Sequence, residues 1–284
     1  MPDGRGSKMR EKLLNNTIKT CVLIFLLLIF VHAFEAVVLR MDQTVFAENF
    51  INKVFGIIVM AVVLKMLDWQ WKDIGFSPKG LGKGMLIGLG LSAVSFLIAN
   101  LAETLILAKQ GNHVHLGFYV TGFSLTGDTV IQQGIGFILM CIFFNIINVI
   151  MEEGTFRGLF YGIIRTDHSM KTALLIQSLL FGIWHVVTPL HNLIDGDIGF
   201  AAFAGLSIGY IILAGMMGIK WGLLYQMTGS LYAGMTDHFC NNCIATNLLH
   251  VVTDTGTDEL MIVRVLIAQV ISFGIVMLLW MKKR

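Results

Sequence analysis

The sequence predicts an all-α polytopic membrane protein with about eight transmembrane helices and both termini in the cytoplasm. Hydrophobic residues make up 56% of the 284-residue chain, and the mean hydropathy is +0.77. Charged residues make up only 13%, against about 25% in a typical soluble domain. Only three prolines occur, which favours long uninterrupted helices. The net charge of +2 is too small to indicate a nucleic-acid partner, so we expect the lipid bilayer to be the main surrounding.

Eight stretches are apolar over about the 20 residues that a membrane span needs. They cover residues 17–39, 46–67, 84–108, 133–162, 172–190, 199–219, 227–250 and 259–281. A basic stretch before the first one resembles a signal peptide, but no small-residue cleavage site follows it. We therefore interpret residues 17–39 as a retained first helix and residues 1–284 as a single integral membrane domain.

The distribution of lysine and arginine predicts the orientation of these spans, because cytoplasmic loops carry an excess of both. One set of loops holds the N-terminal basic cluster, Lys72, Lys79, Lys83, Arg165, Lys171, Lys220 and the C-terminal Lys282–Arg284. The opposite loops hold mainly acidic residues, such as Asp195 and Asp254. The termini are therefore expected in the cytoplasm, and the membrane would be the cell membrane in a prokaryote.

Two further patterns concern packing and the membrane surface. Residues 68–81 mix aromatic residues with lysines, which is typical of an interfacial segment. Small residues recur at four-residue spacing in three places and predict close helix packing. These places are Gly84/Gly88, Gly154/Gly158/Gly162 and Ala201/Gly205/Gly209.

The fourth predicted span contains two adjacent carboxylates, Glu152 and Glu153, followed by Arg157. A charged group at membrane depth is costly, so a compensating partner or a chemical role is expected. Glu153 and Arg157 are separated by four residues, share a helix face and can form an ion pair. Glu152 points about 100° away from Glu153 on a regular helix. Its face continues a stripe with Asn145 and Asn148, which could hydrogen-bond to it or to neighbouring helices.

Two other spans carry polar residues at a similar depth. His185 follows Phe181 by four residues in the fifth span, and Asn242 follows His238 by four in the seventh. At a rise of about 1.5 Å per residue, Glu152, His185 and His238 lie about 15–21 Å from the cytoplasmic ends of their helices. Packing gives no reason for this coincidence, so the three helices are expected to build one site.

The order of these motifs resembles a known family. Glu-Glu-x-x-x-Arg (152–157), Phe-x-x-x-His (181–185) and His-x-x-x-Asn (238–242) occur in the same order in the CPBP intramembrane proteases. This family, also called Abi, includes the CAAX prenyl endopeptidases and bacteriocin-processing and immunity proteins. The resemblance covers a core of about residues 70–250. It implies an intramembrane endopeptidase that acts on a membrane-anchored, prenylated or hydrophobic peptide.

The resemblance also implies roles for the motif residues. Glu152 and His185 would activate a water molecule, and His238 and Asn242 would bind the oxyanion, roles that suit their chemistry. The Glu153–Arg157 pair would orient Glu152 and neutralise local charge. Glu152, His185 and His238 would also form a zinc ligand set, so a metalloprotease stays open beside a glutamate-dependent enzyme without a cofactor.

Two other classes of function compete with the protease. The fold could serve as a non-proteolytic membrane scaffold or a bacteriocin self-immunity protein, although every motif residue is intact. A proton-coupled transporter would need inverted repeats or broken helices at the midplane, and the sequence shows neither clearly. The oligomeric state has no correlate in the sequence.

Overall fold

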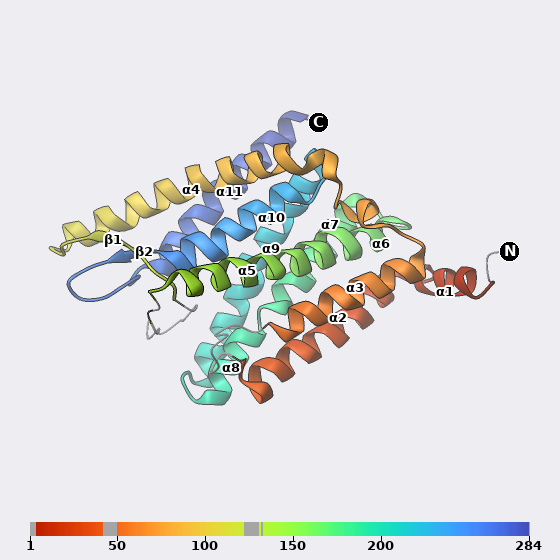
Figure 1. The fold of residues 1–284 in the computed structure, drawn as a ribbon, viewed down its shortest axis with the longest axis horizontal. Helices are drawn as coiled ribbons and strands as arrows, with labels where there is room; N and C mark the ends of the chain where they lie inside the picture. The colour runs from red at the N-terminus through yellow and green to blue at the C-terminus, as the bar shows by residue number, and fades with distance from the viewer. Residues whose placement is uncertain (1–3, 42–49, 122–130, 132, 284) are drawn as a thin grey trace.

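The structure is a computed structural model that describes residues 4–41, 50–121, 131 and 133–283. Helices dominate it (Figure 1). Within the described residues, six helical segments are long and apolar enough to cross a membrane. They are Thr17–Leu39, Pro78–Lys109, Ile135–Arg165, Met170–Asp195, Phe200–Thr228 and Met261–Lys283. The chain is thus an integral multi-pass membrane protein, as its composition predicts.

The elements follow one another with few breaks. The first half contains α1 (Gly4–Leu14), α2 (Thr17–Phe34), a π-helical turn (Glu35–Leu39), α3 (Ile51–Leu67), two 3₁₀ turns (Trp71–Ile74 and Pro78–Gly80), α4 (Leu81–Lys109) and β1 (His115–Phe118). The second half contains α5 (Ile135–Glu152), the π-helix η5 (Glu153–Phe160), α6 (Tyr161–Arg165), α7 (Met170–Trp184), α8 (Val187–Asp195), α9 (Phe200–Thr228), α10 (Tyr232–Phe239), the π-helix η6 (Cys240–Leu248), β2 (Leu249–Val252) and α11 (Met261–Lys283). The prediction of eight spans is therefore confirmed in part, because six helical segments of the described residues are long and apolar enough to cross a membrane.

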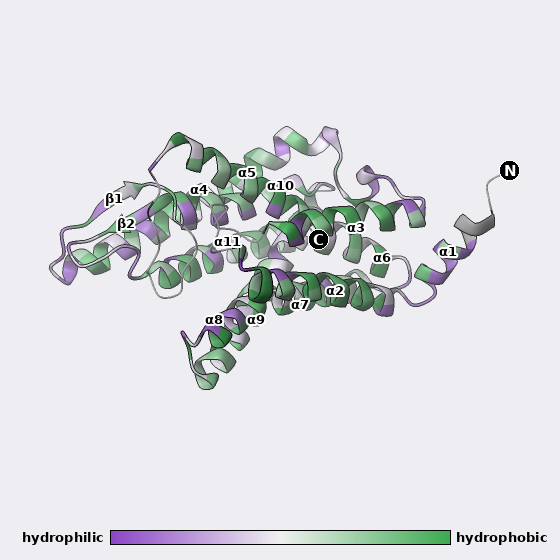
Figure 2. Ribbon diagram, turned by 60° about the horizontal axis from the view of Figure 1, so that its bottom comes forward, coloured by the Kyte–Doolittle hydropathy of each residue, from purple (hydrophilic) through white to green (hydrophobic). Residues whose placement is uncertain are grey.

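The outer surface of the bundle is apolar. Leu86 and Leu97 on α4 are each 71% exposed, and Ile212 on α9 is 67% exposed. In a bilayer such side chains face acyl chains, while each helix satisfies its backbone hydrogen bonds internally. Figure 2 shows hydrophobic colour along the long helices, whereas α1 and the region of β1 and β2 contain hydrophilic patches. The apolar surface thus marks the part of the molecule that faces lipid.

Three helices change their winding beside the predicted motifs. The fourth span passes from α5 into η5 between Glu152 and Glu153. α10 passes into η6 two residues before Asn242. α7 ends at Trp184, and His185 caps it before α8 begins at Val187. π-Helical turns are rare in proteins, and those that occur are often found at functional sites. Their position therefore favours a site at this level of the bundle.

Glycines allow the closest helix contacts. A Cβ on Gly88 of α4 would collide with the carbonyl oxygen of Ala233 on α10, and one on Gly158 would lie 2.8 Å from that of Ile74. These contacts confirm the predicted packing at both positions. The same prediction is wrong for Gly205 and Gly209, which meet no atom within 4 Å in the described part of the chain. They lie on a surface of α9 that faces away from the bundle.

Hydrogen bonds tie several chain segments together at one end of the bundle. Thr17 Oγ1 donates to Asp167, the Leu231 amide donates to the Gly75 carbonyl, and Lys283 Nζ donates to the Met227 carbonyl. These contacts gather the start of α2, the α6–α7 turn, the 3₁₀ segment and the ends of α9 and α11. Residues 68–81 lie among them.

The other end carries a small antiparallel sheet, in which His115 of β1 pairs with Val252 of β2. This sheet corrects the predicted seventh span, because its helix ends at Leu248 and the chain continues as a strand. The sixth predicted span, by contrast, ended too early. α9 continues to Thr228, so Lys220 lies inside the helix and is only 1% exposed. Lys220 is therefore not a loop cation.

Candidate active site

Glu152 lies at the centre of a buried polar cluster. It is the last residue of α5 and is 3% exposed. Its Oε1 accepts hydrogen bonds from Lys53 Nζ at 2.6 Å and from Trp184 Nε1 at 3.0 Å. Its Oε2 has no hydrogen-bond partner among the described residues and lies 3.6 Å from His238 Nε2. One carboxylate oxygen is thus held by donors, and the other remains available as an acceptor.

Glu153 points to the other side of His238. Its Oε1 lies 2.9 Å from His238 Nδ1, and its Oε2 lies 3.4 Å from Arg157 Nε. The Arg157 guanidinium also stacks over the Phe181 ring, with 3.8 Å between them. The predicted Glu153–Arg157 pair is therefore present and fully buried. The two adjacent glutamates bracket one imidazole, each facing a different ring nitrogen.

His185 has a defined tautomer in its neutral form. Its Nδ1 lies 2.8 Å from the Phe181 carbonyl oxygen. A carbonyl oxygen only accepts, so Nδ1 carries the proton and Nε2 keeps the lone pair. Its ring also contacts Phe181 edge to face and stacks against Tyr210. The cap position at the end of α7 and these two rings hold the imidazole in place.

A cavity of about 280 Å³ connects these side chains. The polar side chains that line it include His32, Lys53, Asn145, Asn148, Glu152, His185, Tyr210, His238, Asn241 and Asn242. Glu152, His185, His238 and Asn242 therefore share one cavity, as does the asparagine stripe predicted beside Glu152. Glu153 and Arg157 do not line it and lie behind His238. The arrangement can hold water against a carboxylate and two imidazoles.

Both hydrogen-bond donors to Glu152 were missed in the sequence. Lys53 neutralises Glu152, and Trp184 donates to the same oxygen while its ring stacks on His32 at 4.2 Å. Lys53 lies seven residues inside the predicted span 46–67, so the rule that flagged Glu152 applied to it as well. Trp184 carries no such signal, because a tryptophan in an apolar helix is ordinary. Its role depends on how α7 packs against α5.

The geometry does not fit the zinc set considered from the sequence. Within the described part of the chain, no three His, Cys, Asp or Glu side chains are arranged to hold a metal ion. The Lys53 ammonium occupies a position 2.6 Å from Glu152 Oε1, where a ligated cation would compete with it. Glu153 accepts a hydrogen bond from Nδ1 of His238, so only Nε2 of that ring faces Glu152, at 3.6 Å from Oε2.

The comparison with protein families follows the same residues. Residues 134–244 match the family model for Type II CAAX prenyl endopeptidase Rce1-like proteins. This range contains all seven motif residues from Glu152 to Asn242 and lies inside the predicted core of residues 70–250. The match confirms the resemblance and supports a membrane peptidase at the level of the family. No match to the chain was found among curated proteins or among solved structures.

Proposed function

We propose that this protein is an intramembrane endopeptidase in which Glu152 activates a water molecule for attack on a peptide bond. The observation that carries this proposal is the shared cavity of Glu152, His185, His238 and Asn242. The match of residues 134–244 to a CAAX prenyl endopeptidase family supports it independently. A purely structural polar cluster would have no need for an open cavity in its middle.

Water would bind between Glu152 and the lone pair on His185 Nε2. Glu152 takes a proton from this water while the oxygen of the water forms a bond to the carbonyl carbon of the substrate. The electron pair of the C=O bond moves to the oxygen, which becomes an oxyanion. His238 Nε2–H and Asn242 Nδ2–H donate hydrogen bonds to it. The intermediate then collapses, the C–N bond breaks, and Glu152 returns its proton to the leaving amine.

The residues behind the cavity would keep the reacting groups in place. Lys53 supplies the positive charge that a buried carboxylate needs, and it leaves Glu152 Oε2 available for the water. Glu153 accepts a hydrogen bond from His238 Nδ1–H, and with carboxylates on both sides the ring would act as an imidazolium that keeps a proton on Nε2 for the oxyanion. Arg157 in turn compensates the charge of Glu153.

The substrate class follows from the membrane setting and from the family. We propose the tail of a lipidated or prenylated protein, or a hydrophobic peptide, that enters the cavity from the bilayer. The cavity wall also includes the rings of Phe50, Phe144 and Tyr210, which suit an apolar side chain. The whole chain would act as a single membrane domain with its core at about residues 70–250.

We further propose that all eight predicted spans cross the membrane. α3 and the continuous α10–η6 segment each contain 17 residues, close to the minimum length for a span. The end that gathers the start of α2 and the end of α11 is rich in lysine and arginine, which favours the cytoplasm. Cysteine labelling from each side of the membrane, at the Lys8 and Asp254 positions, would test this topology.

The decisive experiment is cleavage of fluorogenic CAAX peptides by the purified protein in liposomes, with and without a prenyl group on the cysteine. We expect cleavage by the wild type and its loss in Glu152→Gln. Glu11→Gln, at an exposed position of α1, is the matched control. The double variant Lys53→Met/Glu152→Gln removes both charges and guards against misfolding. Full cleavage by a folded Glu152 variant would refute the proposal.

The same assay distinguishes the remaining alternatives. Cleavage that resists a zinc chelator and needs Glu152 supports the glutamate-dependent mechanism, whereas cleavage restored only by added zinc supports a metalloprotease. The scaffold or self-immunity alternative predicts that the biological phenotype of a deletion strain is rescued equally by wild type and Glu152→Gln.

A further inference from the structure

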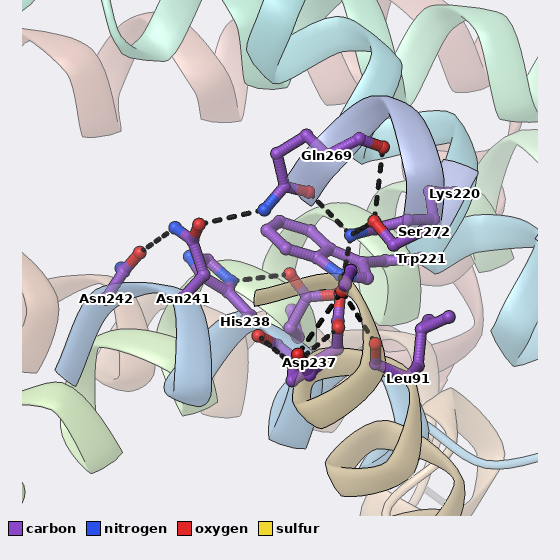
Figure 3. A network of polar contacts seen from close by, with 12 residues as sticks. Leu91, Lys220, Trp221, Asp237, His238, Asn241, Asn242, Gln269 and Ser272 are labelled. Carbon is purple, nitrogen blue, oxygen red and sulfur yellow. Dashed lines mark hydrogen bonds and ion pairs between the residues drawn. The ribbon is translucent and has the colours of Figure 1, made fainter. Parts of the chain in front are cut away.

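A second buried polar network lies behind the candidate site, between α4, α9, α10 and α11 (Figure 3). Its centre is Lys220, whose ammonium is buried at 1% exposure. Lys220 Nζ lies 2.5 Å from Asp237, 2.6 Å from Gln269 Oε1 and 3.0 Å from Ser272 Oγ. An ammonium group has three N–H donors and no acceptor, so these three contacts use its full capacity.

From Lys220, a chain of three amides leads to the cavity. Gln269 Nε2 donates to Asn241 Oδ1 at 2.8 Å, and Asn241 Nδ2 donates to Asn242 Oδ1 at 2.7 Å. Figure 3 shows these side chains in line, with Asn242 at the end farthest from Lys220. Asn242 is the only one of the three amides that the sequence motifs had singled out.

The chain has a direction because an ammonium can only donate. Lys220 therefore requires the oxygen of Gln269 to face it, which turns the Gln269 nitrogen towards Asn241. The oxygen of Asn241 must accept from that nitrogen, so the Asn241 nitrogen faces Asn242. The oxygen of Asn242 is then occupied. Within the described residues, its Nδ2 donates to no protein acceptor, and the side chain lines the cavity.

The same lysine supports the second oxyanion donor. Asp237, paired with Lys220, accepts a hydrogen bond from Trp221 Nε1 at 2.8 Å. The Trp221 ring stacks on the His238 ring with 4.1 Å between centroids and 16° between planes. Lys220 is thus linked to His238 through Asp237 and Trp221, and to Asn242 through Gln269 and Asn241.

We infer that Lys220 and Gln269 are positioning residues that orient the Asn242 amide so that it presents its N–H donors, and not its oxygen, to the cavity. Neither residue lines the cavity, so they act on the Asn242 amide only through Asn241. The inference rests on the proposed protease function for its catalytic consequence. The amide orientation itself follows from the hydrogen bonds and is testable without activity.

Gln269→Glu is the sharpest variant, because it changes one NH₂ group to an oxygen without changing shape. An ionised carboxylate only accepts hydrogen bonds. Asn241 would then turn its nitrogen to the new carboxylate and its oxygen to Asn242. Asn242 would in turn donate to Asn241 and present its oxygen to the cavity. Gln269→Met is the neutral companion variant, and Gln110→Glu, at the exposed C-cap position that follows α4, is the matched control.

Kinetics test the catalytic consequence. Loss of one oxyanion donor typically lowers kcat by about 10²–10³-fold. We expect a kcat decrease of that order for Gln269→Glu with KM and melting temperature close to the wild type, and a smaller decrease for Gln269→Met. A general packing defect would instead lower the melting temperature and change KM together. A folded Gln269→Glu protein with unchanged kcat would overturn the inference.

Nuclear magnetic resonance tests the orientation without activity. In protein labelled with ¹⁵N-asparagine, we expect both Gln269 variants to shift the side-chain NH₂ signals of Asn241 and Asn242, and Gln110→Glu to shift neither. An unchanged Asn242 signal in both variants overturns the inference, even where peptides are cleaved. If the wild type cleaves no peptide, the protease proposal fails, and these signals still decide the orientation. If Gln269→Glu does not fold, Gln269→Met gives the same decision.

Discussion

Lys53 and Glu152 are 99 residues apart in the sequence, yet the ammonium of one donates to the carboxylate of the other at 2.6 Å. Their side chains are 11% and 4% exposed, so the pair is almost removed from solvent. It connects α3 to the end of α5 at the candidate site. The buried lysine therefore offsets the free energy that is needed to bury the charged glutamate.

The first prediction concerns this pair. Lys53→Met leaves Glu152 as an uncompensated buried charge, which should lower the free energy of unfolding by about 3–5 kcal/mol. Thermal unfolding in detergent measures the effect. Lys65→Met, at an exposed position of the same helix, is the control and should change stability by less than about 0.5 kcal/mol. The double variant Lys53→Met/Glu152→Gln should recover part of the loss. No recovery would contradict the pairing.

The second prediction concerns His185. His185→Phe keeps an aromatic ring against Phe181 and Tyr210 but removes Nε2. Because general base assistance typically contributes about 10²–10⁴-fold, kcat for peptide cleavage should fall within that range while KM changes little. His113→Phe, at an exposed position beyond α4, should cleave like the wild type. Equal rates for the two variants would remove His185 from the mechanism.

The third prediction concerns the contact between α4 and α10, which carries His238. A methyl group on Gly88 would collide with the Ala233 carbonyl and the Thr236 side chain, whereas one on Gly90 would meet no atom within 4 Å. Gly88→Ala should therefore cost about 1–3 kcal/mol by overpacking. Gly90→Ala should be neutral or slightly stabilising, because alanine favours helix. The melting temperatures of the two variants check this, and an equal response would show that α4 and α10 are less tightly packed.

The fourth prediction concerns the outer end, where Asp258 lies between His250 and Arg264 at 2.6 and 2.9 Å. Burial raises the pKa of Asp258, but the hydrogen bond with His250 and the charge of Arg264 outweigh it and hold this pKa below its usual value. Because the pKa of Asp258 is lower in the folded state, its ionised form stabilises the fold at pH values above the unfolded-state pKa of about 3.9. This stabilisation is lost as the pH falls through the folded-state pKa.

The melting temperature of the wild-type protein should therefore fall below about pH 4. Asp258→Asn should be less stable at pH 7, and its melting temperature should depend less on pH in the acid range. Melting curves from pH 7 to pH 3 measure both. Asp254→Asn, at an exposed position in the same loop, is the control and should keep the wild-type slope. Parallel slopes for wild type and Asp258→Asn would show that other groups dominate the acid response.

Much of the site could be read from the sequence because its residues are anomalous in their surroundings. Glu152, His185, His238 and Asn242 are polar groups inside apolar stretches, and such groups are rare enough to be informative. Helical spacing also predicted the Glu153–Arg157 pair, which the structure contains at 3.4 Å. It did not predict that Glu153 reaches His238, because this contact joins η5 to α10 across 85 residues of sequence.

Hydropathy by itself determined that this chain is a multi-pass helical membrane protein, since composition over about 20 residues decides whether a segment partitions into lipid. The motifs predicted which residues share one site. Only the tertiary structure decided their partners, because lateral contacts between helices depend on packing that no single window contains. It placed Lys53 on Glu152, and it moved Lys220 from a predicted loop to a buried position behind Asn242.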